Sequence, residues 1–233
     1  MDETVAKWLA DVAIELEAEP GVDETVDAVA RYARSALGCD DVGILLVSTG
    51  VIETAAATSE RVRLADDLQR ELGEGPCLSS LETHESYIIG DVATDDRWPK
   101  WGPRAAALGF ASALSVQLFT KDRAFGSVNL FSNERDFFDD ADESVAQVFA
   151  RHASVALAAA RQEQGLLKAI DGRKLIGQAE GILMERFNID ADRAFAVLNR
   201  YSQHHNLKLR VVAEGIVRNG QLPGTVSGTA AGS

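Results

Sequence analysis

Basic side chains gather near the C-terminus of this 233-residue chain. Residues 166–233 carry nine Lys and Arg against six Asp and Glu, whereas residues 1–165 carry 14 against 30. The net charge is therefore +3 in the C-terminal part and −16 in the rest. Arg193 and Arg200, seven residues apart, lie on nearly one face of a helix and can neutralise phosphate groups. This division of charge predicts two domains with different tasks.

Aromatic and further basic side chains accompany this pair of arginines. Tyr201 or the adjacent His204 and His205 could stack on unpaired bases, the usual contact of proteins with single-stranded RNA. The alternative is that the cations form solvated helix faces and that Tyr201 belongs to a small core. The whole set favours nucleic-acid binding more strongly than any one member does. We predict RNA contacts for Arg173, Lys174, Arg186, Arg193, Arg200, Tyr201, Lys208 and Arg210.

The composition of the whole chain excludes several classes of protein. Hydrophobic residues make up 46% and charged residues 25%, and the net charge of −13 rules out a basic surface over the entire chain. The longest apolar runs are shorter than the ~20 residues that span a membrane, and the acidic start does not resemble a signal peptide. Cys39 and Cys77 are the only cysteines, which indicates neither a disulfide framework nor a zinc site. We expect a cytoplasmic protein that does not bind a membrane.

The sequence contains no recognisable catalytic set. A nucleophile elbow, a zinc-protease HExxH motif, a phosphate-binding P-loop and a dinucleotide fingerprint are all missing. The acidic residues Asp139, Asp140, Asp142 and Glu143 suit the start of a helix, where the helix dipole favours negative charge. We therefore do not expect an enzyme.

Apolar periodicity predicts an α+β fold for the first part of the chain. Two helices come first, and the second ends at Gly38. A third helix covers 59–72, and a loop at 95–103 holds Trp98 and Trp101. Because hairpins join the strands, the sheet is expected to be antiparallel, with helices on its flanks. The predicted strands cover residues 41–48, 51–58, 86–92, 112–120 and 124–131.

A long helical pattern follows from Asp139 for about thirty residues. One apolar stripe includes Val155 and Leu166, and a second stripe includes Phe149 and Ala153. One stripe can cover the sheet while the other meets a partner helix, which favours a connector that dimerises the protein. A helix buried only within its own domain would show the same periodicity. We expect a homodimer.

Three short helices are predicted at the C-terminal end, over 174–187, 191–202 and 207–217. Each is too short to be stable alone, so they must pack as a three-helix bundle. The small, uncharged residues 225–233 are expected to form a disordered tail. The predicted domains are thus 1–165 and 166–224.

Residues 173–223 resemble the ANTAR domain, the RNA-binding module of transcription antiterminators. The resemblance implies a dimer that holds paired hairpins in a nascent transcript and so prevents a terminator stem from forming. Glu180 stands where a Lys is common in the family, and Asn199 where a second Arg often precedes Arg200, which predicts weaker or more selective RNA binding. The matching segments are Arg173-Lys174-Leu175-Ile176, Gln178-Ala179-Glu180-Gly181-Ile182-Leu183-Met184, Ala194-Phe195, Tyr201-Ser202-Gln203, Asn206, Lys208-Leu209-Arg210 and Val212-Ala213.

Residues 22–160 look like a GAF sensory domain, which implies a small-molecule ligand of unknown kind. Members that bind cyclic nucleotides often carry a Lys where this chain has Glu134, so the ion pair of that motif is missing here. Haem ligation by His84 or His152, and a bilin or redox role for Cys77, are further alternatives. The resemblance runs through Leu72-Gly73-Glu74-Gly75-Pro76-Cys77, Asp91-Val92, Asp96-Arg97-Trp98-Pro99 and Leu108-Gly109-Phe110.

The two resemblances together imply a regulator in which a GAF domain senses an input and controls RNA binding by an ANTAR domain. Three rival functions stay open. Three short helices can also form a DNA-binding helix-turn-helix, which would make the chain a DNA-binding transcriptional regulator with a GAF sensor. A redox enzyme of the GAF type that uses Cys77 is the second. The third is a ligand-binding dimer whose C-terminal helices only bind another protein, against which the basic bias of residues 166–233 argues.

Overall fold

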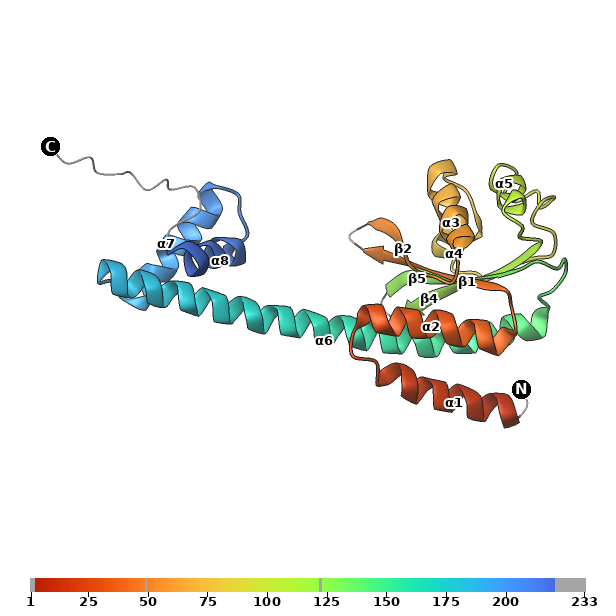
Figure 1. Cartoon of the computed structure of the whole chain (residues 1–233), viewed down its shortest axis with the longest axis horizontal. Coiled ribbons are helices and arrows are strands. Elements are labelled where there is room, and N and C mark those ends of the chain that lie inside the picture. Colours follow the sequence, from red (N-terminus) through yellow and green to blue (C-terminus); the bar gives the residue numbers. More distant parts are fainter. Residues whose placement is uncertain (1–2, 49, 122, 221–233) are drawn as a thin grey trace. The chain divides into compact units, whose positions relative to one another are not determined.

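A computed structural model describes residues 3–48, 50–121 and 123–220 of the chain (Figure 1). The chain divides into two compact units, Met1–Glu163 and Gln164–Ser233. The expected disordered tail, residues 225–233, lies outside the described residues.

One antiparallel sheet organises the first unit. The α+β class, the antiparallel sheet with flanking helices and the five strands are confirmed, although β3 is shorter than the predicted strand 86–92. Neighbouring strands are antiparallel throughout. In spatial order the strands are β2 (Val51–Ala57), β1 (Asp41–Ser48), β5 (Arg123–Ser132), β4 (Ser112–Thr120) and β3 (Tyr87–Ile89).

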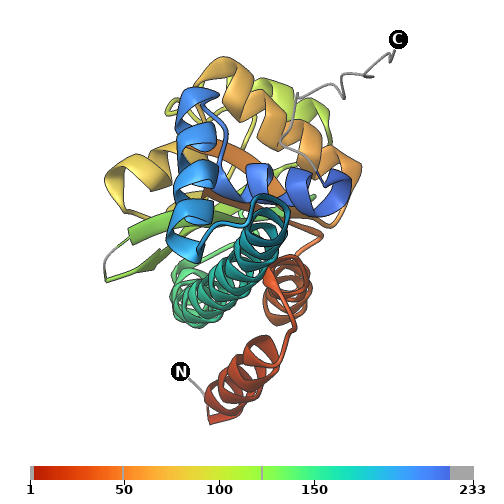
Figure 2. The same ribbon diagram turned by 90° about the vertical axis from the view of Figure 1, so that its left-hand side faces the viewer.

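Helices cover both faces of this sheet (Figures 1 and 2). On one face lie α2 (Val22–Leu37) and the first part of α6 (Asp140–Phe187), with α1 (Glu3–Glu17) packed against them. Alternate strand residues such as Ile44 and Leu114 point into this core because successive side chains of a strand face opposite ways. Of the two predicted stripes on the long helix, the one with Phe149 and Ala153 is buried here.

The other face carries α3 (Glu60–Leu72), α4 (Pro76–Thr83) and α5 (Trp101–Ala107). Trp98 and Trp101 are both buried and pack in a second core together with Phe110 and Phe131, whose rings stack 4.3 Å apart. The two tryptophans therefore form a packed cap over the sheet. The predicted loop 95–103 is wrong where α5 begins, because Trp101 anchors a short helix in this core.

Two helical features differ from the predicted pattern. The helix α4, which is absent from the predicted elements, starts at Pro76. Proline suits the first position of a helix, although in sequence it follows Gly73 and Gly75 and is therefore typical of a turn. The helix α6 runs from Asp140 to Phe187 without a break, whereas the sequence suggested a new helix near Lys174. Gly172 lies inside α6 and costs too little helix stability to end it.

The second unit packs the end of α6 against α7 (Ala191–His204) and α8 (Leu209–Asn219). Asp190 begins α7 by accepting a hydrogen bond from the Arg193 N–H at 2.8 Å. Gly220 ends α8 in a left-handed conformation. The small core that results consists of Ala179, Leu183, Ala194, Leu198, Val212, Ala213 and Ile216.

Candidate nucleic-acid interface and sensor site

One face of α7 carries the candidate nucleic-acid interface. Ala194 and Leu198 are buried against α6 and α8, so the residues on the opposite side of α7 face solvent. A groove of about 630 Å³ lies there and brings together three predicted RNA contacts. Its lining consists of Arg193, Ala196, Val197, Arg200, Tyr201, His204 and His205.

The positive charge of this groove is accessible. Arg193 and Arg200 are both exposed. Arg193 makes a 3.6 Å ion pair with Asp190, and because both partners are largely exposed this pair is weak and easily exchanged for a phosphate. Within residues 3–48, 50–121 and 123–220, the Arg200 side chain makes no ion pair or hydrogen bond.

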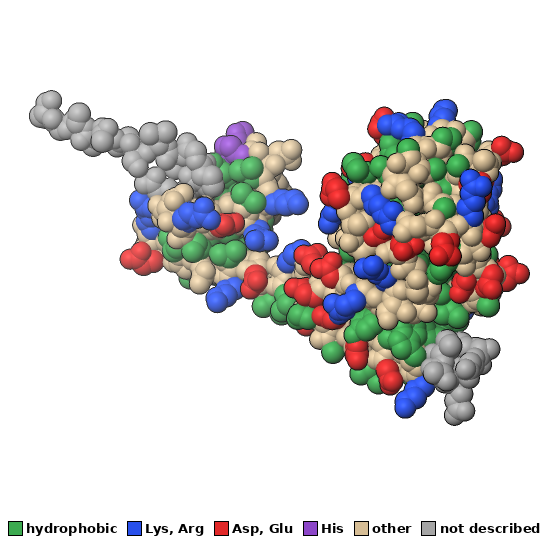
Figure 3. All heavy atoms as spheres, turned by 45° about the vertical axis from the view of Figure 1, so that its right-hand side comes forward, with side chains coloured by type: hydrophobic (Ala, Val, Ile, Leu, Met, Phe, Trp, Pro, Cys, Tyr) green, Lys and Arg blue, Asp and Glu red, His purple; other side chains and the backbone are tan. Residues whose placement is uncertain are grey.

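An aromatic wall closes one side of the groove. The rings of Tyr201 and His205 stack 3.9 Å apart at an angle of 19°, and His204 meets His205 edge to face at 4.9 Å. Histidine side chains are visible on the surface of this unit next to hydrophobic ones (Figure 3). Sequence reasoning named this aromatic set and missed Ala196 and Val197, the apolar part of the lining.

The remaining predicted RNA contacts lie outside the groove lining. Arg186 donates to the carbonyl oxygen of Gly220 and so caps the end of α8, which is a structural role. Arg173 and Lys174 are exposed within α6. Lys208 is the residue that begins α8, and Arg210 is exposed in its first turn.

The first unit holds a cluster of buried polar side chains between the sheet and α3 and α4. Ser115 donates to the Asn129 side-chain oxygen at 2.8 Å, and the Gln117 amide donates to the Ser80 carbonyl oxygen at 3.2 Å. The opposite face of the same strands is apolar. The face under α3 and α4 carries polar side chains instead, which need hydrogen-bond partners because they are buried. The buried members are Asp66, Gln69, Ser80, Ser115, Gln117, Ser127 and Asn129.

Several atoms of this cluster lack a hydrogen-bond partner among the described residues. They are the Oδ1 atom of Asp66, the Nε2 atom of Gln69, the Oγ atom of Ser80 and the Nδ2 atom of Asn129. Buried polar atoms are rarely left unpaired, because each costs about 1–3 kcal/mol. This set contains both donors and acceptors.

Asp66 is the titratable centre of the cluster. Burial raises the pKa of Asp66 to about 7, and the hydrogen bond from Thr54 at 3.1 Å offsets only part of that rise. The carboxyl group is therefore protonated below neutral pH and becomes a buried anion above it.

Cys77 lies in the same cluster with its thiol fully buried. Its Sγ atom is 2.7 Å from the Ser127 hydroxyl oxygen, and burial raises the pKa of Cys77 to about 12. The thiolate is the reactive form of cysteine, so this thiol is inert at neutral pH.

The GAF-like segment from Leu72 to Cys77 contacts both the buried polar cluster and the start of α5. Gly73 and Gly75 have positive φ values of 64° and 151°, and a side chain on Gly75 would clash with the Gln69 amide oxygen. That oxygen accepts from the Cys77 N–H at 2.9 Å. Glu74 accepts from the Trp101 N–H at 2.8 Å and so fixes the start of α5.

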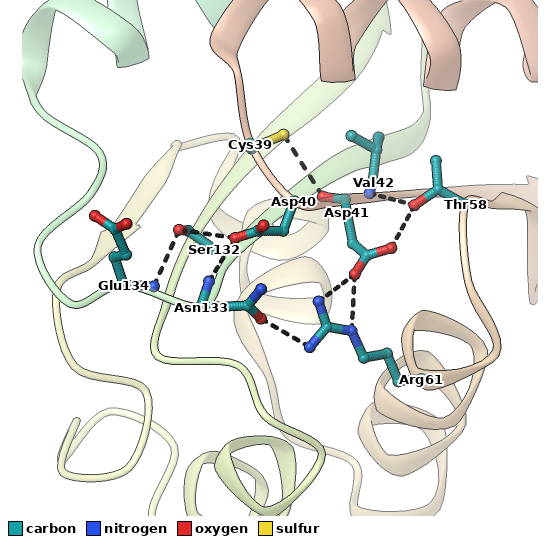
Figure 4. A network of polar contacts seen from close by, with 9 residues as sticks. All are labelled: Cys39, Asp40, Asp41, Val42, Thr58, Arg61, Ser132, Asn133 and Glu134. Atoms are coloured by element: carbon teal, nitrogen blue, oxygen red, sulfur yellow. Dashed lines mark hydrogen bonds and ion pairs between the residues drawn. The ribbon is translucent and has the colours of Figure 1, made fainter.

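A second polar network ties α3 to the segment that precedes α6 (Figure 4). Arg61 donates to the Asp41 carboxylate at 2.8 Å and to the Asn133 side-chain oxygen at 2.8 Å. Burial alone would raise the pKa of Asp41, but hydrogen bonds from nearby hydroxyls and from Arg61 hold it below its usual range. Glu134, at the Lys position of the cyclic-nucleotide motif, contributes its N–H to Ser132 at 3.1 Å.

The two histidines considered as haem ligands lie in different surroundings. The His84 ring packs against the Gln117 amide with its Nδ1 atom 2.9 Å from Nε2, and His152 is exposed on α6. Among the described residues, no group of three or more His, Cys, Asp and Glu side chains could hold a metal ion.

Two family profiles match the chain, the GAF domain over residues 19–158 and the ANTAR domain over residues 164–217. The chain therefore belongs to the GAF domain family and carries an ANTAR domain after its GAF domain, as its motifs predicted. This domain combination is that of a regulatory protein and supports a sensor-regulated antitermination regulator.

Solved structures support the fold of the first unit. A free methionine-R-sulfoxide reductase from Neisseria meningitidis matches with 19% identity and a TM-score of 0.55, covering 70% of this chain and 95% of that one. A GAF domain of a phosphoenolpyruvate-protein phosphotransferase from Coxiella burnetii matches with 17% identity and a TM-score of 0.56, covering 69% and 96%. No curated protein matches the sequence. None of the helices that the structure describes is long and apolar enough to cross a membrane.

Proposed function

We propose that this chain is a cytoplasmic transcription antitermination regulator whose ANTAR domain binds paired RNA hairpins in nascent transcripts. The observation that carries this proposal is the α7 groove, where Arg193, Arg200 and Tyr201 converge on a surface open to solvent. Cations for phosphates beside rings for bases are the two contacts that single-stranded RNA needs. The GAF domain senses a small-molecule input and controls this binding.

The test compares binding of the full chain to an RNA with two hairpins, to a single hairpin and to duplex DNA. We expect the two-hairpin RNA to bind best. The double variant Arg193→Ala with Arg200→Ala should lower that affinity roughly tenfold to a hundredfold. The slope of log affinity against log salt concentration should fall by about 1–2, which corresponds to one or two lost phosphate contacts. The double variant Arg63→Ala with Arg151→Ala is the control, since it removes two exposed charges from the other unit. Equal affinity of the two double variants would contradict the assignment of the groove.

The same experiment addresses the DNA-binding alternative. A helix-turn-helix protein places a recognition helix in the major groove of a duplex. Tighter binding to duplex DNA than to hairpin RNA would favour that function and overturn ours.

The burial of Cys77 opposes the second alternative, a redox enzyme. A catalytic cysteine needs an accessible thiol with a lowered pKa, whereas the Cys77 thiol is buried and its pKa is raised to about 12. We therefore propose a protein without catalytic activity. Rapid modification of Cys77 by a thiol reagent in the folded protein would contradict this part of the proposal.

The buried polar cluster around Asp66 and Asn129 supports a small-molecule input. Its unpaired donors and acceptors come from α3, α4 and β5, so a ligand that satisfied them would join these elements. Mass spectrometry of the purified full chain under native conditions would reveal a bound molecule. An absorbance scan of visible wavelengths tests haem and bilin separately.

A stripe on α6 supports a homodimer. Leu166 and Ile170 are 59% and 61% exposed, far more than is usual for such side chains, and they are one helical turn apart. A second copy of the same helix would cover them as in a coiled coil. Sedimentation of the purified protein tests this expectation.

A further inference from the structure

The aromatic wall of the α7 groove is ordered by its own contacts. Besides the stack of its ring on Tyr201, His205 has its Nδ1 atom 3.1 Å from the Tyr201 carbonyl oxygen. A carbonyl oxygen can only accept, so Nδ1 carries a proton and donates. His205 is exposed, but the ring stack and this hydrogen bond together hold its ring in one orientation.

We infer that this wall is the stacking site for one unpaired RNA base, with Arg193 and Arg200 on the phosphates that flank it. This inference rests on the proposed RNA-binding function and adds to it which part of the RNA the groove takes. The ligand is a single nucleotide turned out of a hairpin loop, and His205 is the residue against which its base lies.

The lining of the groove distinguishes a base from a phosphate. A site for phosphates alone needs only polar and charged groups, whereas this groove also contains Ala196, Val197 and three aromatic rings. Val197 is 38% exposed, so apolar surface is available to the flat side of a base. Covering it removes apolar area from water, which adds to the attraction between stacked rings.

The same geometry explains why the base must be unpaired. In an A-form stem the bases stack on one another, and the deep major groove excludes side chains. A loop nucleotide has free faces and can enter the groove on α7. Because His205 is already fixed by Tyr201, binding the base costs little further side-chain entropy.

Stacking on a ring does not distinguish one base from another, because every base has a π-face. The inference therefore predicts that removing the base weakens binding more than exchanging it for a different base. A site that reads the edge of a base by hydrogen bonds would show the opposite order.

The experiment uses an RNA that the full-length wild-type protein selects from a pool of two-hairpin RNAs with randomised loops. Each loop nucleotide of this RNA is then replaced in turn by an abasic one, and the dissociation constants are measured at one salt concentration. One abasic position should weaken binding roughly tenfold. Exchange of that base for any other should cost less.

The variants identify the residue behind this effect. His205→Ala should bind the intact RNA roughly tenfold more weakly and should show no additional loss with the abasic RNA. His205→Phe keeps a ring that can stack on Tyr201 and should restore both the affinity and the abasic penalty. Gln203→Ala, an exposed change on α7 outside the groove, is the matched control and should behave as wild type.

Different results separate this inference from the proposed function. If His205→Ala keeps the full abasic penalty while Arg193→Ala with Arg200→Ala weakens binding, the stacking site is refuted and the RNA-binding function stands. If the pool yields no bound RNA, the proposed function itself fails. Thermal unfolding of His205→Ala shows whether α7 is intact. If it is not, the stacking site is tested with His205→Phe instead: an affinity and abasic penalty like those of the wild type support it, and their loss in a folded variant refutes it.

Discussion

The GAF domain keeps its polar cluster under α3 and α4 out of water, whereas the ANTAR domain presents a groove of cations, rings and apolar side chains on α7 to solvent. Asp66 and Asn129 are buried and carry unpaired atoms, so a change in their protonation or hydrogen bonding changes the free energy of folding strongly. Arg193 and Arg200 are exposed and can exchange partners at little cost.

This difference suits the two tasks. A buried group responds to a proton or a small molecule by a change in folding free energy, which can shift a domain between two states. Exposed cations and rings can reach a long polymer without any such change. Substitutions in the GAF cluster should therefore alter stability, and those in the ANTAR groove should alter affinity.

The largest effect is expected for Asp66→Asn. The folded protein keeps the Asp66 proton up to a pKa of about 7, whereas the unfolded chain releases it near 3.8. Stability contributed by this group therefore falls as the pH rises from about 4 to 7 and is constant above that. The variant should lack this loss and be more stable by roughly 4 kcal/mol at pH 8.

Denaturant titrations of both proteins at several pH values measure this difference. Glu60→Gln is the control because it changes an exposed carboxyl group on the same helix that does not act on Asp66, and it should leave the pH dependence unaltered. A gain in stability that does not grow between pH 4 and pH 7 would show that Asp66 is ionised in the folded state.

The next effect concerns the proposed dimer. Leu166→Ser together with Ile170→Ser removes two exposed apolar side chains that should be covered by a second copy. Burial of each is worth about 1.5–3 kcal/mol, so we expect dimer dissociation to become at least a hundredfold easier. Sedimentation at several protein concentrations measures it.

Leu64→Ser serves as a control for the dimer test, because Leu64 is also an exposed apolar residue but lies on α3 and not on the stripe of α6. A double variant that sediments as the wild type does would place the interface elsewhere. If the wild type is monomeric at high concentration, the homodimer is excluded.

A smaller effect is expected for Arg61→Ala. The Asp41 side chain is only 8% exposed and would lose the cation that faces it at 2.5 Å. Hydrogen bonds to charged groups are worth about 1.5–3 kcal/mol, so we expect a loss near 2 kcal/mol at pH 7. Because the pKa of Asp41 is lowered in the folded protein, this stabilisation is present at neutral pH and disappears as the pH falls below about 4.

Chemical denaturation at pH 7 and pH 3 measures this loss. Arg104→Ala removes a more exposed arginine that pairs with Glu71 at 3.3 Å and should cost less than about 1 kcal/mol. Equal losses for the two variants would mean that the network in Figure 4 contributes no more than a surface ion pair.

The sequence predicts the sheet and the ANTAR helices well because their apolar periodicity is regular. The polar cluster was missed for the same reason. Ser115 and Gln117 alternate with apolar residues of β4, a pattern typical of a strand with one solvated face, yet α3 and α4 cover that face. Tertiary packing, which local patterns do not contain, decides this.

The candidate groove was predictable in its charges and rings and not in its apolar lining. Arg193 and Arg200 at a spacing of seven, with Tyr201 beside them, point to one helix face through helical periodicity alone. Arg186 has the same charge but caps α8. The sequence does not show that Arg186 caps a helix, because this contact depends on where α8 ends in space.

The smallest effect, for Asp190→Ala, separates stability from affinity within the ANTAR domain. Asp190 caps α7 by accepting from the Arg193 N–H at 2.8 Å, and its loss should cost about 1 kcal/mol of stability. The same change frees the Arg193 side chain from its ion pair, so RNA affinity should stay equal or rise slightly. Asp192→Ala removes an equal charge from the first turn of α7 without removing the cap, and should cost less stability. If Asp190→Ala instead weakens RNA binding by as much as Arg193→Ala, the start of α7 itself contributes to the interface, and exposed cations alone do not account for the groove.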